Sequence, residues 1–362
     1  MSKRIEDLDK NFQAAGVKTE DGIAWHTVNA TPFVVAGLPW FKENGGEFYR
    51  FPKRAKSILR DALWELGTMP SGGRVRFKTD SPVLSVRVQH GRPDLAMPHM
   101  CAVGMSGLDL YEGSPKKMIY WSSSRPTIAK EPYVVQFFTG LAKKLRELTI
   151  YLPTYNDLIR FEIGLAPGAK LSAPTPYRHK PPVVFYGTSI TQGGCASRVA
   201  NGFVPVVGRK LGIDVVNLGF SGNGQCDREL IPLLDELDMA CLVVDCVANM
   251  KLKQMQADYA PFLDALRLRR PKLPVLLMTK FKFAKANYLG ADEGNAENKI
   301  VLNTYRRMQR QGDRNVYLLD ARQLIGREQN HPSVDGVHLT DQGFQRLADG
   351  IALVLKRILR LS

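Results

Sequence analysis

A serine follows a short apolar stretch at a place suited to a nucleophile. Residues 183–186 read Val-Val-Phe-Tyr, residues 187–194 read Gly-Thr-Ser-Ile-Thr-Gln-Gly-Gly, and the serine is Ser189. The first stretch predicts a buried strand and the second a turn with unpaired backbone N–H groups, which can receive negative charge. We therefore expect Ser189 at the open edge of a sheet, where its Oγ can attack a substrate and its N–H can support an oxyanion.

Near the other end of the chain, the segment Asp335-Gly336-Val337-His338 supplies a carboxylate and an imidazole within one predicted loop. A serine hydroxyl is a weak nucleophile at neutral pH until a correctly oriented base takes its proton. We expect His338 to be that base and Asp335 to accept the other ring N–H, which stabilises the imidazolium formed during attack. These residue types predict an acyl-serine intermediate, with Ser189, His338 and Asp335 as the triad.

Two further segments supply donors for the oxyanion of such a reaction. The glycine-rich run 219–224 contains Gly222, and Asn249 follows the next apolar stretch. With the N–H of Ser189, the N–H of Gly222 and the side-chain amide of Asn249 form the predicted oxyanion hole, in which loss of one donor typically costs about 3 kcal/mol of barrier. Taken singly, Gly222 could only permit a positive φ and Asn249 could only cap a helix. Their joint occurrence with the triad candidates favours catalysis.

The histidines leave two alternatives open. His331, Asp335 and His338 lie close together in sequence and could ligate Zn or Fe, for which imidazole and carboxylate are suitable ligands. That alternative leaves Ser189 and Asn249 without a role, and we expect no metal and no cofactor. His331 could instead replace His338 as the base, although the proline that follows His331 favours a turn there.

From about residue 178 the chain alternates short apolar stretches with amphipathic ones. Strands are predicted near Val183, Val215, Leu242, Val275 and Val316, and helices near 202–211, 227–237, 253–269, 295–311 and 341–359. This alternation is typical of a flavodoxin-like three-layer α/β/α domain with a parallel sheet, in which ligands bind outside the carboxyl ends of the strands. Because the candidate residues follow successive strands, we expect them to meet at that edge.

The first half predicts β structure instead. Strand candidates alternate apolar and polar residues or stand between turn residues, at 75–77, 84–88, 118–121, 133–138, 148–152 and 158–163. One helix is expected at 55–66, and five prolines between 166 and 182 indicate a semi-rigid linker. We therefore expect an all-β sandwich or jelly-roll domain over residues 1–177 and the α/β domain over residues 178–362.

Composition limits the class of protein. The 362 residues carry 50 Lys and Arg against 35 Asp and Glu, a net charge of +15 that would attract acidic partners. The basic residues are spread along the chain, which disfavours a nucleic-acid-binding protein. No apolar run is long enough for a membrane span, and residues 1–12 lack the apolar core of a secretory signal, so we expect no membrane span and a cytoplasmic location. Five cysteines without metal-type spacing predict thiols, buried at Cys241 and Cys246.

The catalytic segments resemble the SGNH (GDSL-type) hydrolase superfamily, whose four signature residues Ser, Gly, Asn and His stand in separate blocks. Residues 187–190, 217–222, Asn249 and 335–338 match the four blocks in order. Two positions depart from the pattern: a threonine replaces the aspartate of Gly-Asp-Ser, and a methionine follows Asn249 where an aspartate is usual. Neither departure removes a catalytic atom.

A second motif narrows the resemblance. Residues 107–111 read Gly-Leu-Asp-Leu-Tyr, which is similar to the subgroup in which a G-x-D-L-Y β domain precedes the hydrolase domain. This resemblance implies hydrolysis of a carboxylic ester, with a short-chain acyl or acetyl ester, often on a carbohydrate, as the expected substrate. The alternative is a non-catalytic glycan-binding or lipid-binding protein that retains the fold. The sequence leaves the oligomeric state open.

Other residues are candidates for the rim of the substrate site. Lys280 and Lys282 follow the fourth predicted strand and could hold an anionic group or form a solvated loop, and Tyr111 and His331 are further candidates. His90, His99 and Trp121 in the first half could also face the substrate. All four tryptophans stand in the first half, and we expect core packing for them, with stacking on sugar rings as the alternative. They are Trp25, Trp40, Trp64 and Trp121.

Overall fold

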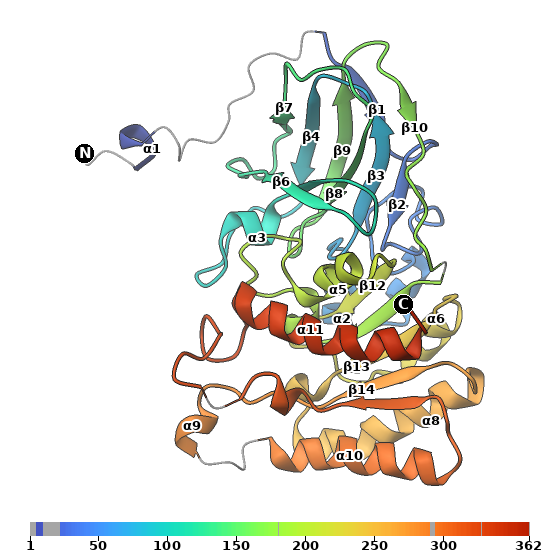
Figure 1. The fold of residues 1–362 in the computed structure, drawn as a ribbon. Coiled ribbons are helices and arrows are strands. Elements are labelled where there is room, and N and C mark those ends of the chain that lie inside the picture. Colours follow the sequence, from blue (N-terminus) through green and yellow to red (C-terminus); the bar gives the residue numbers. More distant parts are fainter. Residues whose placement is uncertain (1–4, 10–21, 180, 290–293, 327, 362) are drawn as a thin grey trace.

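The computed structural model describes residues 5–9, 22–179, 181–289, 294–326 and 328–361. Figure 1 shows a β-sandwich part, with strands β1 to β10, above an α/β part that begins with β11. Most of segment 1–12, on which the expectation of a cytoplasmic location rests, lies outside the described residues. Within it the structure describes the short helix α1 (Ile5–Leu8).

The β-sandwich part consists of two antiparallel sheets. One has the strand order β1-β9-β4-β7 and the other β10-β3-β8-β5-β6, with β2 paired to β3. Val75, Val86 and Ile163 are among the fully buried side chains of the core between them, which confirms the predicted all-β sandwich. The strands are β1 (Ala24–Thr27), β2 (Val34–Ala36), β3 (Arg74–Thr79), β4 (Leu84–His90), β5 (Asp109–Glu112), β6 (Ile119–Ser123), β7 (Tyr133–Phe138), β8 (Arg146–Tyr151), β9 (Leu158–Leu165) and β10 (Leu171–Ser172).

The helix expected at 55–66 is divided in two. A 3₁₀ helix, η2 (Lys53–Ser57), precedes α2 (Asp61–Gly67), and a further short helix, α3 (Ala102–Ser106), was not expected. The break falls where Arg60 takes an extended backbone with ψ 143°. At this break the Arg60 guanidinium donates hydrogen bonds to Asp227 of the α/β part.

The α/β part contains one parallel sheet with the strand order β12-β11-β13-β14-β15, the order of flavodoxin-like folds. Every residue of β11, β12, β13 and β14 is buried, because helices cover both faces of the sheet. The flavodoxin-like prediction is thus confirmed. The strands are β11 (Val183–Gly187), β12 (Val215–Gly219), β13 (Cys241–Asp245), β14 (Val275–Met278) and β15 (Val316–Leu319).

Two helical layers enclose this sheet. Helices α5 and α11 pack on one face, and α6, α8 and α10 pack on the other (Figure 1). The predicted helix 253–269 is interrupted by a π-helical turn at Met255–Tyr259. The elements are α4 (Ser189–Gln192), α5 (Phe203–Leu211), η3 (Arg228–Leu230), α6 (Ile231–Asp235), η4 (Val247–Asn249), α7 (Leu252–Gln254), η5 (Met255–Tyr259), α8 (Ala260–Arg269), α9 (Ala286–Leu289), α10 (Asn295–Arg310), η6 (Ala321–Gln323) and α11 (Asp341–Ile358).

Two buried arginines of the β-sandwich part hold β12. Arg50 donates to the carbonyl oxygens of Asn217 and Gly219, and its guanidinium lies 4.5 Å from the ring centroid of Phe220. Arg74 donates to the carbonyl of Val215 at 3.1 Å. Both side chains are almost fully buried. Part of the excess positive charge is therefore structural and unavailable to an acidic partner.

The proline-rich stretch 166–182 is held by specific contacts, although it was expected to contain little that packs. The Tyr177 hydroxyl accepts a hydrogen bond from Arg74 Nε at 2.8 Å, and the Arg76 guanidinium lies 4.2 Å from the centre of its ring. Thr175 donates from its N–H and its hydroxyl to Glu147 at 3.0 and 2.7 Å. These contacts fix the segment between β10 and β11.

The four tryptophans serve packing in the structure. Trp40 and Trp64 are buried in the core that also contains the α6 and α8 side of the parallel sheet. Trp121 stacks on Phe138 with ring centroids 4.8 Å apart, and Trp25 lies under the Arg87 guanidinium at 4.0 Å. The expectation of core packing is therefore favoured over sugar stacking.

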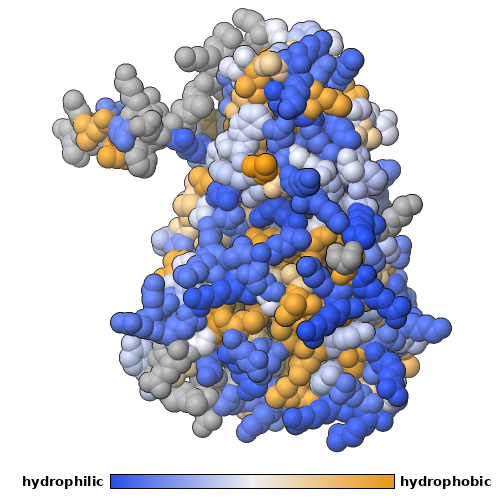
Figure 2. All heavy atoms as spheres, viewed as in Figure 1, coloured by the Kyte–Doolittle hydropathy of each residue, from blue (hydrophilic) through white to orange (hydrophobic). Residues whose placement is uncertain are grey.

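All five cysteines are free, and Cys101 alone among them is exposed, so the buried thiols predicted at Cys241 and Cys246 are confirmed. Figure 2 shows a mostly hydrophilic face on which hydrophobic residues are scattered. Within the described ranges, the helices are too short or too polar to cross a lipid bilayer.

Candidate active site

Ser189 is the first residue of α4 and follows β11 after a single residue, Thr188. The Thr188 hydroxyl accepts a hydrogen bond from the Ile190 N–H at 3.2 Å, and the Thr191 hydroxyl accepts one from the Thr188 N–H at 3.3 Å. This reciprocal capping box holds the sharp turn from strand to helix, which Gly193 ends with φ 109°. Thr188 thus shapes the turn where the Gly-Asp-Ser motif has an aspartate.

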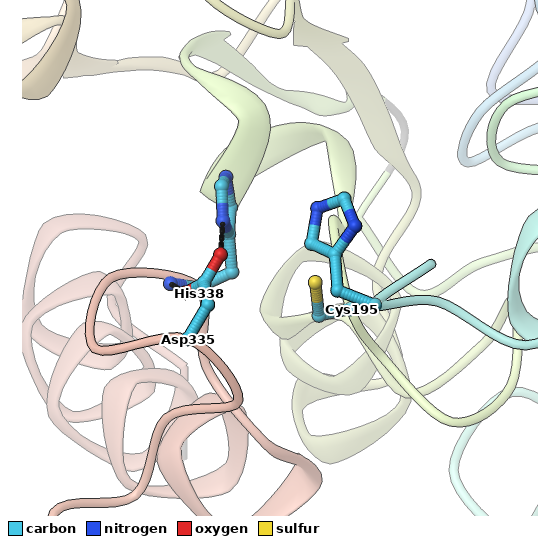
Figure 3. Close-up of side chains that lie close together, drawn as sticks. Cys195, Asp335 and His338 are labelled. Carbon is cyan, nitrogen blue, oxygen red and sulfur yellow. Dashed lines mark hydrogen bonds and ion pairs between the residues drawn. The ribbon is translucent and has the colours of Figure 1, made fainter. Parts of the chain in front are cut away.

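The structure brings Ser189, His338 and Asp335 together. Ser189 Oγ lies 2.9 Å from His338 Nε2, and His338 Nδ1 lies 2.7 Å from Asp335 Oδ2. Figure 3 shows the Asp335 and His338 side chains joined in this way. Because a carboxylate can only accept, Nδ1 carries the ring proton, and Nε2 is left to accept from the serine hydroxyl. The arrangement can deprotonate Ser189 during attack on a carbonyl carbon.

The loop of Asp335 fixes its charge state. Asp335 Oδ1 accepts from the backbone N–H groups of Val337 and His338, at 2.9 and 2.7 Å. Partial burial alone would raise the pKa of this carboxyl, but the hydrogen bonds from the His338 side chain and from the two backbone groups outweigh burial and lower its pKa to about 2. Asp335 is therefore charged at neutral pH and can accept the hydrogen bond from His338 Nδ1.

The loop after β12 approaches the end of β11 closely. A Cβ on Gly224 would lie 2.2 Å from the carbonyl oxygen of Gly187, so this position requires glycine. Gly222 is exposed and takes φ 70°, a left-handed conformation that glycine adopts without strain. The two glycines let the loop turn at the carboxyl edge of the sheet beside α4.

Asn249 is the last residue of η4, directly after β13. Its Oδ1 accepts a hydrogen bond from the Gly224 N–H at 3.2 Å. In the described part of the chain its Nδ2 has no hydrogen-bond partner, and the side chain is half-buried. The loops after β12 and β13 are thus joined, and one amide donor is left available.

Two residues that the sequence did not single out support this arrangement. Gln192 accepts the Ser221 N–H at 2.9 Å and donates to the carbonyl of Thr154 at 3.1 Å. The Tyr155 hydroxyl donates to the carbonyl of Ser189 at 3.3 Å. Gln192 lies within the serine motif, which could have indicated it, whereas nothing in the sequence around Tyr155 predicts this contact.

Asp245, the last residue of β13, lies beneath the serine turn. It accepts a hydrogen bond from the Thr191 hydroxyl at 2.8 Å. Burial raises the pKa of this carboxyl to about 7, although the Thr191 hydrogen bond acts in the opposite direction. A partly protonated carboxyl therefore supports the capping box from below, and no motif in the sequence indicated this.

Two of the proposed rim residues of the α/β part, His331 and Lys282, are in contact. His331 has both ring nitrogens engaged, with Ser333 Oγ and with the carbonyl of Lys282, each at 2.9 Å. Lys280 Nζ lies 4.7 Å from the centre of the Phe283 ring. In the described ranges none of Lys280, Lys282 and His331 forms a hydrogen bond with the triad candidates. His331 therefore takes no part as base or as a metal ligand beside Asp335 and His338.

Tyr111 does not lie at a rim, contrary to expectation. It is buried against Tyr151 and under the Arg209 guanidinium, which lies 4.6 Å from its ring centroid. The neighbouring Asp109 is fully buried and accepts the Ala200 N–H at 3.0 Å. The Gly-x-Asp-Leu-Tyr motif therefore joins the β-sandwich part to the segment that follows α4. His90 is also buried, with Nε2 3.0 Å from the Tyr133 hydroxyl.

His99 does lie beside the catalytic candidates. Its ring centroid is 5.7 Å from that of His338. Within the described ranges, His99, Cys195, Asp335 and His338 form the one group of side chains whose ligand atoms could hold a metal. The metal site considered from the sequence combined His331 with Asp335 and His338. In the structure His331 does not belong to this group, so its inclusion was wrong.

A serine, an imidazole and a carboxylate at the carboxyl edge of a flavodoxin-like sheet define a class of ester hydrolases. A family model of GDSL-like lipases and acylhydrolases matches residues 180–356, and the GxDLY model, the N-terminus of SGNH-hydrolase-type esterases, matches residues 23–171. The chain belongs to the SGNH (GDSL-type) hydrolase superfamily, in the subgroup with an N-terminal GxDLY domain. It is an ester hydrolase by class.

Solved structures share the fold over most of the chain. A protein assigned as a GDSL-like lipase from Bacteroides ovatus superimposes with TM-score 0.84 at 24% identity, over 94% of this chain and 99% of that one. The salicylyl-acyltransferase SsfX3 from a tetracycline biosynthetic pathway gives 0.74 at 18%, over 95% and 99%. A family two carbohydrate esterase from Clostridium thermocellum, in complex with cellohexaose, gives 0.57 at 16%, over 80% and 93%. Comparison with curated proteins yields no match.

Proposed function

We propose that this protein hydrolyses a short-chain carboxylic ester through an acyl-serine intermediate. Ser189 is the nucleophile, His338 the general base and Asp335 the residue that orients its ring. The observation that supports this most is the continuous chain of contacts, 2.9 Å from Ser189 Oγ to Nε2 and 2.7 Å from Nδ1 to the carboxylate. A non-catalytic binder would have no need of this chain.

In the first half of the reaction, Ser189 Oγ attacks the ester carbonyl carbon while His338 Nε2 takes the hydroxyl proton. The oxyanion accepts hydrogen bonds from the N–H of Ser189, the N–H of Gly222 and Nδ2 of Asn249. The imidazolium then gives its proton to the leaving alkoxide oxygen, so the alcohol departs and the acyl group stays on Ser189.

In the second half, water attacks the acyl carbon and His338 takes a proton from that water. The tetrahedral intermediate collapses, Ser189 Oγ recovers the proton from the imidazolium, and the carboxylic acid leaves. Asp335 remains ionised throughout, in keeping with its lowered pKa.

For the alcohol part of the substrate we propose a carbohydrate. The carbohydrate esterases among the structural neighbours support this choice. Ser189 itself is 7% exposed, and the neighbouring His99 and Asp335 are exposed to solvent, where the alcohol part of a substrate would lie. The loop that carries Lys282 lies against the Asp335 loop, because the Ala284 N–H donates to the carbonyl of Gly336 at 2.9 Å. Lys282 therefore remains the candidate for binding an anionic group on the substrate.

Labelling by a serine-directed organophosphonate tests the nucleophile. We expect one adduct per chain, on Ser189 by peptide mass mapping, and no adduct on Ser189→Ala. Turnover is then compared across p-nitrophenyl esters of increasing acyl length and acetylated sugars. An adduct on another residue would refute the assignment, and ligand binding without an acylation burst would favour the non-catalytic binder.

A further inference from the structure

Four potential ligands for a metal ion converge beside the proposed nucleophile. His99 comes from the β-sandwich part, Cys195 follows α4, and Asp335 with His338 comes from the loop before α11. One ligand atom from each side chain lies within 4.8 Å of the corresponding atom of every other. Figure 3 shows Cys195 beside the hydrogen-bonded pair of Asp335 and His338.

The donor set fits Zn²⁺ by its chemistry. One thiolate, two imidazoles and one carboxylate make the mixed tetrahedral set that zinc accepts, with metal–ligand distances of about 2.0–2.3 Å. Closing the site requires the four side chains to draw together from separations of up to 4.8 Å. His99 and Asp335 are exposed, so an ion can enter from solvent.

The backbone holds Cys195 in place for this. Cys195 takes φ 72°, a left-handed conformation that is uncommon for a residue other than glycine. Its N–H donates to the sulfur of Met100, at 3.4 Å, in the same turn of chain that carries His99. A strained residue at a functional site is an observation that invites a functional explanation.

We propose that His99, Cys195, Asp335 and His338 bind Zn²⁺ and that bound zinc reversibly inhibits the hydrolase. Binding releases the thiol proton to solvent, and the Sγ–Zn bond replaces the S–H bond. If the ion binds His338 Nδ1, the proton of the neutral ring lies on Nε2. If the ion binds Nε2, the lone pair of that nitrogen is donated to the metal. In both cases His338 cannot accept the proton of Ser189, so hydrolysis stops.

The binding half of this proposal stands apart from the proposed function, and only the inhibition rests on it. Binding is therefore measured on Ser189→Ala, which keeps all four ligands and needs no activity. We expect one Zn²⁺ per chain by competition with a chromogenic chelator, and a thiolate-to-metal absorption band when Co²⁺ replaces zinc. Cys195→Ser should lose the band, and Cys101→Ser, which alters the exposed thiol, should keep it.

His99→Gln is a second ligand variant, which keeps the test valid if Cys195→Ser misfolds. Because His99 is exposed, we expect this substitution to leave the fold intact. Loss of a direct ligand should weaken zinc binding at least about 100-fold, since even outer partners of a metal site contribute 10- to 100-fold. The matched control His331→Gln, whose ring nitrogens face Ser333 and Lys282, should bind zinc as the parent does.

Equal zinc affinity in the parent, His99→Gln and Cys195→Ser proteins would overturn the site. Zinc bound at these residues without loss of ester hydrolysis in the wild-type protein would overturn the inhibition. Absence of hydrolysis in zinc-free wild-type protein would instead count against the proposed function and leave the binding result intact.

Discussion

Asn249 has two separable functions in the proposed mechanism, and two substitutions distinguish them. Its Oδ1 accepts the Gly224 N–H, while Nδ2 has no partner among the described residues and is the proposed oxyanion donor. Asn249→Ala removes both functions. Asn249→Asp keeps an acceptor for Gly224 but replaces the donor by a carboxylate oxygen.

The expected magnitudes follow from these contacts. Loss of one oxyanion donor costs about 3 kcal/mol of barrier, or roughly 100- to 1000-fold in kcat. Asn249→Ala should in addition lose about 1–3 kcal/mol of unfolding free energy, because the buried Gly224 N–H is left without an acceptor. Asn249→Asp should keep most of that stability and lose at least as much activity, because its negative charge repels the oxyanion.

The assay is hydrolysis of p-nitrophenyl acetate, with the acylation burst resolved from steady-state turnover, together with urea unfolding. Asn315→Asp is a matched control, since Asn315 lies at the amino end of β15, at the opposite edge of the sheet. If Asn249→Asp retains activity within about twofold of wild type while Ser189→Ala is inactive, Asn249 is not an oxyanion donor.

Three further predictions concern Asp335, Asp245 and Arg50. Asp335→Asn should lower kcat about 10⁴-fold, because the variant favours the wrong tautomer of the His338 ring. The pKa of Asp335 is lowered from 3.8 to about 2, so its contribution to the free energy of unfolding should be lost only as the pH falls through that interval. The pH dependence of unfolding in wild type and variant checks this. The pKa of Asp245 is raised from 3.8 to about 7 by burial, so the folded state binds an extra proton and its stability should fall as the pH rises through that window. Asp245→Asn should remove this dependence, and an equal change of Tm with pH in the two proteins would contradict the prediction. Arg50→Met should lower the free energy of unfolding in urea by at least about 3 kcal/mol, because buried carbonyl groups at the end of β12 lose their donor. Arg50→Lys should recover only part of this loss. Full stability in both variants would show that other groups hold β12.

The sequence predicted the α/β part well, because its signals are local. Short apolar runs buried on both faces and amphipathic helices each leave a pattern within about ten residues, and the carboxyl ends of parallel strands meet at one edge whatever the loops do. The sequence alone therefore predicts that Ser189 and His338, 149 positions apart, lie together.

The sequence could not predict contacts that depend on how the two parts pack. Tyr111 reads as an aromatic residue free to face a substrate, yet Arg209 of α5 covers it. The group formed by His99 and Cys195 depends on a loop of the β-sandwich part lying over the turn after α4, and no periodicity encodes that approach. Asp245 looks like any polar residue at a strand end until its burial under Thr191 is seen.

The contacts of the β-sandwich part converge on the loops that carry the proposed catalytic residues. Arg50 donates to the backbone that leads into the Gly222 loop, and the Tyr155 hydroxyl donates to the carbonyl of Ser189. Trp40 lies in the core beneath the parallel sheet, where it cannot stack on a sugar. The α/β part on its own would leave β12 carbonyl groups without donors and apolar surface uncovered. The contacts between the two parts therefore help to hold the end of β12 and the serine turn, on which the proposed oxyanion hole depends.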